Sequence, residues 1–167
     1  MRNASANPSS GDKTIDIVTD LEENCRLILG NTTQMHQVVM NLCTNAYQAM
    51  RETGGQIHVR LGEVNIGYEE MAQRIGIKMG PHLHLVVQDN GVGMDATVLE
   101  RIFEPYYTTQ EPGKGTGLGL SVIHGIVKNH GGFITVESLP GQGSSFHQGR
   151  FLRLPAKFTH IYVLQKK

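Results

Sequence analysis

A glycine-rich stretch at residues 113–120 constrains this chain more than any other part of its sequence. It reads Gly-Lys-Gly-Thr-Gly-Leu-Gly-Leu, with glycine at every second position, and an apolar run suited to a helix follows directly. Glycine lets backbone N–H groups come close to a ligand, and a helix N-terminus carries partial positive charge. The junction therefore predicts an anion site. Its spacing matches neither a P-loop nor a Rossmann fingerprint, and on the glycines alone a flexible linker before a helix is the alternative.

Composition limits the classes of partner. The chain has 167 residues, enough for one domain with its own core, and its 15 basic and 15 acidic residues cancel without forming blocks of like charge. This balance argues against a nucleic-acid-binding or membrane-binding surface. Cys25 and Cys43 lack metal or redox spacing and are expected to be free, buried thiols. With no apolar run of membrane-spanning length and no signal peptide, the sequence predicts a cytoplasmic chain.

The pattern of apolar residues predicts an alternation of strands and helices between a polar N-terminal tail and a divergent C-terminal one. We expect three parts: a tail or linker stub at 1–13, a catalytic domain at 14–155 and a C-terminal tail at 156–167. The elements expected are strands at 14–19 and 25–29 forming a hairpin, a helix at 31–50, a strand at 56–64, a helical turn at 69–74, a strand at 82–88, a short helix at 96–102, a helix from the glycine-rich stretch to 129, and strands at 133–138 and near 146.

The helix expected at 31–50 has two distinct faces. Its apolar stripe consists of Met35, Val38, Val39, Leu42, Ala46, Ala49 and Met50. Its second stripe is built only of carboxamides: Gln34, Gln37, Asn41, Asn45 and Gln48. A solvated helix face normally carries Lys and Glu, whereas side-chain amides offer oxygen to a hard cation and N–H to phosphate. This stripe fits a magnesium–triphosphate ligand, with a merely solvated polar face as the alternative.

A carboxylate stands at the end of the strand at 82–88. Asp89 is followed by Gly91 and Gly93, so it can accept a hydrogen bond from an exocyclic amine while the glycines admit a planar base. A simple Asp-Asn-Gly turn is the alternative. His82 and His84 share one face of that strand, but no third metal ligand is near in sequence, and surface positions are the simpler expectation for both.

Residues 95–115 form a long connection with an aromatic segment at 103–107. We expect Asp95 to cap a short helix that Pro105 ends, and the rest of the connection to act as a lid.

Together these segments resemble the catalytic ATP-binding domain of sensor histidine kinases, in the superfamily that also holds DNA gyrase, Hsp90 and MutL. Four motifs occur in the family's order: Asn41-Leu42-x-x-Asn45-Ala46 resembles the N box, Asp89-x-Gly91-x-Gly93-Met94 the G1 box, residues 103–106 the F box and residues 113–120 the G2 box. The likeness covers about residues 14–146. It implies a two-layer α/β sandwich, the Bergerat fold, with a mixed, mostly antiparallel sheet covered on one face by helices.

The resemblance also implies roles for individual residues, with ATP and Mg²⁺ as the ligands. Asn45 would coordinate Mg²⁺ beside Asn41, Asp89 would bind the adenine amine, and Phe103 and Tyr106 would fasten the lid. The residues expected to contact the nucleotide are Asn41, Asn45, Gln48, Ala49, Asp89, Gly91, Gly93, Met94, Phe103, Lys114, Gly115, Thr116, Gly117, Leu118, Gly119 and Ser144.

One position favours a kinase over a clamp-type ATPase. The hydrolysing relatives place a Glu one turn before the magnesium Asn, where it serves as general base toward water, and this chain has Asn41 there. The implied function is transfer of the ATP γ-phosphoryl to a histidine of a separate dimerisation domain, and from there to a response regulator. The alternatives are the clamp-type ATPase and a nucleotide-sensing module or anti-sigma serine kinase.

The sequence departs from the family at three places. Gln48 and Gln110 stand where basic residues are common, and residues 147–150 separate Phe146 from the closing Leu154-Pro155. None of the eight histidines is followed by Asp or Glu, the pattern of the family's acceptor helix, so we expect the phosphoryl acceptor to lie outside this chain.

Overall fold

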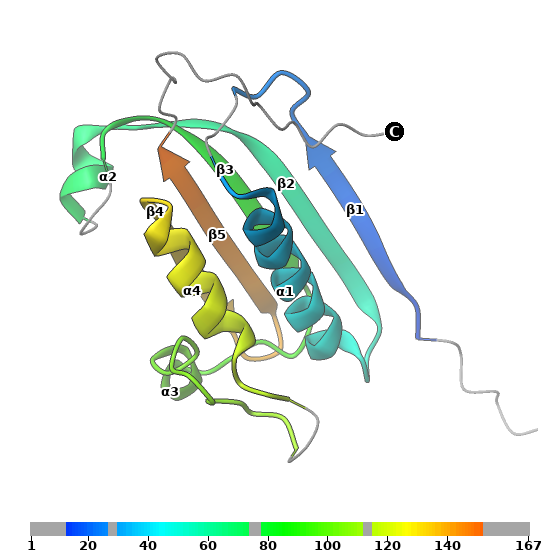
Figure 1. Cartoon of the computed structure of the whole chain (residues 1–167). Helices are drawn as coiled ribbons and strands as arrows, with labels where there is room; N and C mark the ends of the chain where they lie inside the picture. Colours follow the sequence, from blue (N-terminus) through cyan, green and yellow to red (C-terminus); the bar gives the residue numbers. More distant parts are fainter. Residues whose placement is uncertain (1–12, 27–29, 74–77, 112–114, 152–167) are drawn as a thin grey trace, which may run out of the picture.

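The computed structural model describes residues 13–26, 30–73, 78–111 and 115–151. They form two layers, a five-stranded sheet and a layer of helices on one of its faces (Figure 1). Residues 1–12 of the expected tail at 1–13, the whole expected tail at 156–167, Lys114 and the end of the predicted strand at 25–29 lie outside the described residues. Within the described ranges, no helix is long and apolar enough to cross a lipid bilayer.

The sheet is mixed, as expected. Its strands are β1 (Ile15–Leu21), β2 (Gly55–Ile66), β3 (Gly80–Asp89), β4 (Gly132–Leu139) and β5 (Gly143–Phe151), in the spatial order β1-β2-β3-β5-β4. Only β1 and β2 are parallel among these neighbours. The helices are α1 (Thr32–Met50), α2 (Tyr68–Gln73), α3 (Ala96–Leu99) and α4 (Gly119–Asn129). The α/β sandwich predicted from the sequence is confirmed.

Helix α1 begins where the sequence predicted. The side chain of Asn31 accepts a hydrogen bond from the backbone N–H of Gln34 at 3.1 Å, which satisfies a free donor of the first turn. Four residues of the apolar stripe are fully buried: Val38, Leu42, Ala46 and Met50. They pack on the sheet, so this stripe fixes the rotation of α1 and turns the carboxamide stripe to its flank.

Helix α4 lies beside α1 on the same face of the sheet (Figure 1). It buries Ile123, Ile126 and Val127 against the sheet, and Gly131, with φ of 66°, follows its C-terminus as expected. The sheet completes this core with Ile57, Val59, Leu85, Val87 and Phe146.

The predicted hairpin between residues 14–19 and 25–29 is wrong in its described part. Cys25 and Arg26 are not in a strand, and β1 pairs with β2. The side chain of Arg26 forms an ion pair with Glu63 of β2 at 2.6 Å, and the N–H of Glu22 donates to the carbonyl of Leu61. These contacts hold the chain after β1 alongside β2, so it does not turn back on β1.

Strand β5 extends further than the apolar pattern indicated. Residues 147–150 continue the strand, in unbroken register with β3, and do not form an insertion. Phe146 and Gln148 are buried, whereas His147 stacks on His84 at a ring distance of 5.4 Å. At Gly149 the ring of Phe133 occupies the space of a side chain, because an added Cβ would lie 2.2 Å from that ring.

The expectation that His82 is a surface residue is wrong. Only 2% of it is exposed, its ring lies 5.9 Å from that of Phe133, and Nδ1 is 2.9 Å from the carbonyl of Gly80. Aromatic packing and this hydrogen bond explain a buried histidine on a face that no helix covers. Within the described ranges, no cluster of three or more His, Cys, Asp or Glu is placed to hold a metal ion. Cys25 and Cys43 are free, and both are half-buried, less than expected.

Candidate nucleotide site

The carboxamide face of α1 is turned toward the start of α4. The Asn41 side-chain N–H donates to the carbonyl of Gly119 at 3.3 Å. Asn45 lies one turn further on, and its Nδ2 is buried without a hydrogen-bond partner among the described residues. Within the stripe, Nδ2 of Asn45 is thus closed off from water, whereas Gln37 and Gln48 are exposed.

Burial of Asn45 Nδ2 costs free energy unless a ligand accepts a hydrogen bond from it. A buried donor without a partner costs about 1–3 kcal/mol. Its Nδ2 suits a phosphate oxygen, while its Oδ1 is a good ligand for Mg²⁺. The residues present thus fit a magnesium–triphosphate group. Nearby Gln48 is exposed at the end of the same stripe, and Ala49 contributes only its carbonyl, which accepts from the N–H of Val92 at 3.2 Å.

Asp89 ends β3 with only 4% of its surface exposed. Its Oδ1 accepts from the N–H of Gly91 at 2.9 Å. Burial raises the pKa of this carboxyl, and hydrogen bonds from the backbone N–H groups of Gly91 and Ser144 oppose the rise. The result is a buried acceptor supported from two adjacent strands, suited to an amine of a bound base.

Ser138 links the loop after β3 to the β4–β5 turn, a role that the sequence did not indicate. Its hydroxyl donates to the carbonyl of Gly143 at 2.8 Å and accepts from the N–H of Met94 at 2.8 Å. The hydroxyl of Ser144 lies 3.0 Å from it. Nothing in the strand pattern marks Ser138 apart from its place on the helix-facing side of β4.

The structure gives Gly91 and Gly93 a reason other than room for a base. A Cβ on Gly91 would lie 2.6 Å from the carbonyl oxygen of Ala49. A Cβ on Gly93, which has φ of 66°, would lie 2.0 Å from the carbonyl oxygen of Leu139. Both glycines are required by backbone packing on α1 and β4, and their part in admitting the adenine ring stays a prediction. Met94 packs on the hydrophobic core.

The connection at 95–115 is anchored at its start as expected. The side chain of Asp95 accepts from the hydroxyl of Thr97 at 2.6 Å and from the N–H of Val98 at 2.9 Å, and these bonds lower the pKa of the carboxyl. Phe103 is half-buried in the core, with its ring 5.3 Å from that of His124 on α4. Phe103 thus fixes the connection to α4, and its contact with the nucleotide stays a prediction.

Tyr106 anchors the connection through its backbone. Tyr106 is 76% exposed, and a role of its ring in fastening the lid stays a prediction. The N–H of Tyr106 donates to the carbonyl of Gly117 at 2.9 Å, and Tyr106 itself has φ of 66°. Gly117 has φ of 64°, and an added Cβ would lie 2.4 Å from the carbonyl carbon of Tyr106. Glycine is needed here for this close approach of two backbones.

The described part of the glycine-rich stretch leads into α4 as predicted. Leu118 is the N-cap of α4 and makes no side-chain cap hydrogen bond. Thr116 Oγ1 accepts from the N–H of Leu118 at 3.4 Å, and Gly119 has open space where its Cβ would be, with the Asn41 side chain 4.0 Å away. The first-turn N–H groups of this 11-residue helix therefore remain available to an anion beside Asn41.

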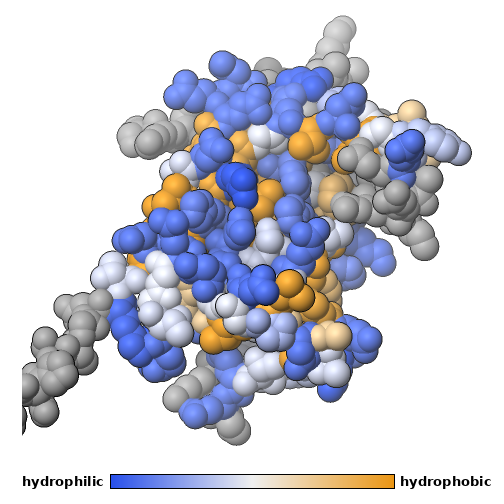
Figure 2. Space-filling view, turned by 180° about the vertical axis from the view of Figure 1, so that it is seen from behind, coloured by the Kyte–Doolittle hydropathy of each residue, from blue (hydrophilic) through white to orange (hydrophobic). Residues whose placement is uncertain are grey.

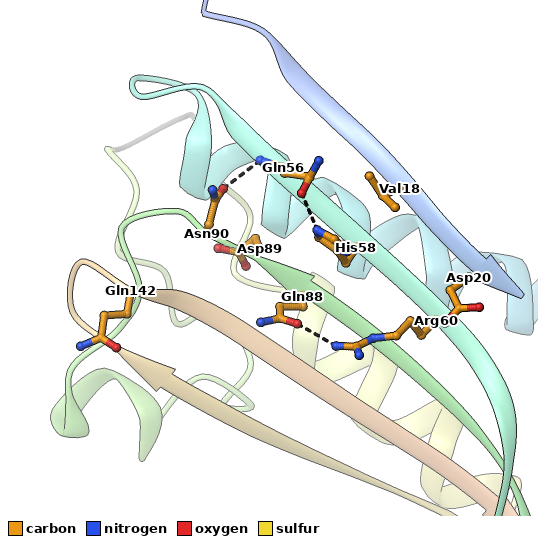
Figure 3. Close-up of a pocket in the computed structure, with 9 residues that line it drawn as sticks. All are labelled: Val18, Asp20, Gln56, His58, Arg60, Gln88, Asp89, Asn90 and Gln142. Carbon is orange, nitrogen blue, oxygen red and sulfur yellow. Dashed lines mark hydrogen bonds between the residues drawn. The ribbon is translucent and has the colours of Figure 1, made fainter.

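A cavity of about 570 Å³ lies on the side of the sheet away from α1 and includes Asp89 in its lining (Figure 3). Strand parity explains this: Ile57 and Val59 face the core, so Gln56, His58 and Arg60 face the other way. Hydrophilic residues dominate that uncovered side in the space-filling view (Figure 2). This cavity is a polar groove on the open sheet face and is separate from Asn45.

Fold and site together define a class of protein. Residues 30–157 match the family of histidine kinase-, DNA gyrase B- and HSP90-like ATPases. The match covers most of the chain, and the chain belongs to this family.

Curated relatives narrow the class. The chain is 40% identical over 134 residues to a sensor kinase, CckA, of Brucella abortus, covering 80% of this chain and 14% of the relative. It is also 40% identical over 132 residues to the sensor histidine kinase ZraS of Escherichia coli O157:H7, covering 79% of this chain and 24% of the relative. The chain thus corresponds to a small part of these relatives, the catalytic ATP-binding domain of sensor histidine kinases.

Solved structures agree with the fold. The catalytic domain of histidine kinase ThkA, in a nucleotide-free form, superimposes with a TM-score of 0.61 at 27% identity, covering 81% of this chain and 79% of that one. Full-length ShkA in complex with AMPPNP superimposes with a TM-score of 0.64 at 23% identity, covering 83% of this chain and 26% of ShkA, which supports the fold alone.

Proposed function

We propose that this domain binds Mg²⁺–ATP and donates the γ-phosphoryl group to a histidine on a separate dimerisation domain. The observation that carries the proposal is the buried Nδ2 of Asn45, which has no partner among the described residues. Asn45 lies one turn from Asn41, whose side chain contacts the start of α4. The adenine amine would reach Asp89, and the phosphates would lie at the N–H groups of residues 115–119. Mg²⁺ held by Asn45 would neutralise charge on the phosphates.

The residues of α1 favour transfer to a protein over hydrolysis. Helix α1 contains no Asp or Glu, and Asn41 uses its side-chain N–H on Gly119. A carboxamide does not take a proton from water at neutral pH, so neither Asn41 nor Asn45 activates water for attack. In the proposed transfer, a histidine nitrogen forms a bond to the γ-phosphorus while the bond to the β–γ bridging oxygen breaks, leaving ADP. The histidine would later pass the phosphoryl group to a response regulator.

The acceptor histidine belongs to another domain in this proposal. In-line transfer needs a nucleophile about 3 Å from the phosphorus. Of the described histidines, His58, His84 and His147 lie on the open face of the sheet. His36 and His124 lie on α1 and α4, and His130 is the C-cap of α4. Residues held on these rigid elements do not swing into line with the γ-phosphorus. Since ATP is the donor, we also propose that the domain works in the cytoplasm, where ATP is abundant.

Incubation with radiolabelled ATP tests the proposal. We expect no label on the isolated chain, and acid-labile label on the histidine of a dimerisation domain from the parent kinase added in trans. An Asn45→Ala variant serves as the inactive control. Acid-labile label on the isolated chain would contradict the proposal. Sustained ATP hydrolysis without a partner would favour the clamp-type ATPase, and nucleotide binding without transfer would favour a sensing module or another acceptor residue.

A further inference from the structure

Gln110 joins two parts of the molecule that are distant in sequence. Its side-chain Nε2 donates a short hydrogen bond to Oε1 of Gln48 on α1, and Gln110 itself is half-buried. Its Oε1 lies over Gly115, where an added Cβ would be only 2.6 Å away. The amide of Gln110 therefore lies between α1 and the first described glycine of the glycine-rich stretch.

Thr108 completes this contact. Its Oγ1 accepts from the N–H of Gln110 at 3.1 Å and would lie 2.8 Å from a Cβ on Gly115. Two polar side chains thus form the surface on which Gly115 rests. A side chain at 115 would displace one of them.

The hydrogen bond between Gln110 and Gln48, which we call the bridge, lies next to the candidate nucleotide site. Gln48 follows Asn45 on the carboxamide stripe, one turn further along α1, so the bridge begins beside the candidate magnesium ligand and ends at the phosphate-facing glycines. Both partners are neutral amides. The bridge consequently forms without phosphate or metal to hold it, unlike a contact between a cation and phosphate.

We propose that Gln110 is a positioning residue that holds Gly115, the first described residue of the glycine-rich stretch, against α1 before nucleotide arrives. Pre-positioned N–H groups then meet the triphosphate with less loss of conformational freedom. This inference rests on the proposed function, because it assigns a role within the same nucleotide site.

A double-mutant cycle on nucleotide affinity is the first test. Affinity for a non-hydrolysable ATP analogue with Mg²⁺ is measured by calorimetry for the parent chain, Gln48→Ala, Gln110→Ala and the double variant. One neutral hydrogen bond corresponds to about a two- to tenfold change. We expect each single variant to bind that much more weakly and the double variant to bind no more weakly than the singles, because both changes remove the same bond.

The matched control is Gln88→Ala. Gln88 is an exposed glutamine whose Oε1 accepts a hydrogen bond from Arg60 at 2.9 Å on the opposite face of the sheet (Figure 3). Its replacement also removes one glutamine hydrogen bond, but we expect the analogue's affinity to stay at the parent value.

Amide hydrogen exchange without nucleotide is the second test and does not depend on ATP binding. We expect faster exchange at residues 106–111 and 115–118 in Gln110→Ala, but not in Gln88→Ala. If the parent chain binds no nucleotide, the proposed function fails and exchange alone decides the role of Gln110. Parent-like affinity and exchange in Gln110→Ala, tighter binding in that variant, or additive losses in the double variant would each overturn the inference.

Discussion

Asp89 and Ser144 are register partners on the adjacent antiparallel strands β3 and β5, and both are buried, with 4% and 6% of their surfaces exposed. The backbone N–H groups of Ser144 and Gly91 both donate to the Asp89 carboxylate. A carboxylate has about four acceptor positions, so two N–H donors leave capacity for a ligand. This pair of strands therefore presents a preformed acceptor at one end of the candidate nucleotide site.

We predict that Asp89→Asn weakens ATP binding without creating a preference for GTP. An amide at this position turns its oxygen to the two backbone N–H groups and its own NH₂ toward the adenine amine, so donor meets donor. An unpaired buried group costs about 1–3 kcal/mol, equal to about a tenfold to hundredfold loss of affinity. Calorimetric titration with ATP and GTP analogues measures the change, and equal ATP affinity in variant and parent would rule out this role for Asp89.

The raised pKa of Asp89 predicts a pH dependence of stability. The folded state holds this proton more tightly than the unfolded state, whose Asp pKa is about 3.9. The contribution to the free energy of unfolding is therefore fully present below about pH 3.9 and is lost as the pH rises through the folded-state pKa. Urea unfolding of parent and Asp89→Asn between acid and neutral pH isolates this contribution, because other groups titrate alike in both. We expect the parent to lose more stability than the variant over that range, and parallel profiles would contradict the assignment.

We predict that Asn45→Ala abolishes Mg²⁺-dependent ATP binding while leaving the protein folded. Because Nδ2 of Asn45 is buried without a partner among the described residues, its removal relieves a desolvation cost of about 1–3 kcal/mol that offsets the lost packing. The free energy of unfolding of the nucleotide-free variant should thus equal or exceed that of the parent. Thr44→Ala, at an exposed neighbour on α1, is the control. Unchanged affinity, or a clear loss of stability, would show that the amide is structural.

Two apolar residues of α1 should contribute very differently to the free energy of unfolding. Leu42 is fully buried against the sheet, whereas Met40 is 49% exposed. We expect Leu42→Ala to lower the free energy of unfolding by about 2–5 kcal/mol, since it leaves a cavity, and Met40→Ala to change it by less than about 1 kcal/mol. Chemical denaturation of both variants measures the difference. Equal costs would mean that α1 is rotated relative to the arrangement described here.

Much of the fold and part of the candidate site could be predicted from patterns of residues close together in the sequence. Spacings of three and four residues fixed α1 and its rotation, so Asn41 and Asn45 were correctly predicted to share a face. The glycine-rich stretch was correctly predicted to precede α4. Such features depend on residues close in sequence, where helix and strand periodicity act directly.

Contacts between distant residues were not predictable in the same way. The parallel pairing of β1 with β2 depends on contacts such as Arg26 with Glu63, which no periodicity encodes. His82 follows the pattern of a surface position, yet Phe133 from another strand covers it. Likewise, Gln48 and Gln110 each appeared as an isolated departure from the family, and only the fold shows that they bind each other.

The turn between β4 and β5 offers a matched pair of glycines for the last prediction. Gly141 and Gly143 both have positive φ, 74° and 87°. An added Cβ on Gly141 would meet nothing within 4 Å, whereas one on Gly143 would lie 2.0 Å from the carbonyl oxygen of Asp89 and 2.7 Å from Cα of Asn90. Those neighbours are backbone atoms, so they can give way only if the end of β3 moves.

Both alanine variants carry the strain of a left-handed backbone, about 1–2 kcal/mol. We expect Gly141→Ala to lower the free energy of unfolding by about that amount and to keep the parent's affinity for an ATP analogue. Gly143→Ala should cost clearly more, and it should also weaken the analogue's binding, because the displaced backbone is that of Asp89 itself. Denaturant unfolding and calorimetry on the two variants separate strain from contact. Equal losses of stability and equal affinities would show that Gly143 does not support the position of Asp89.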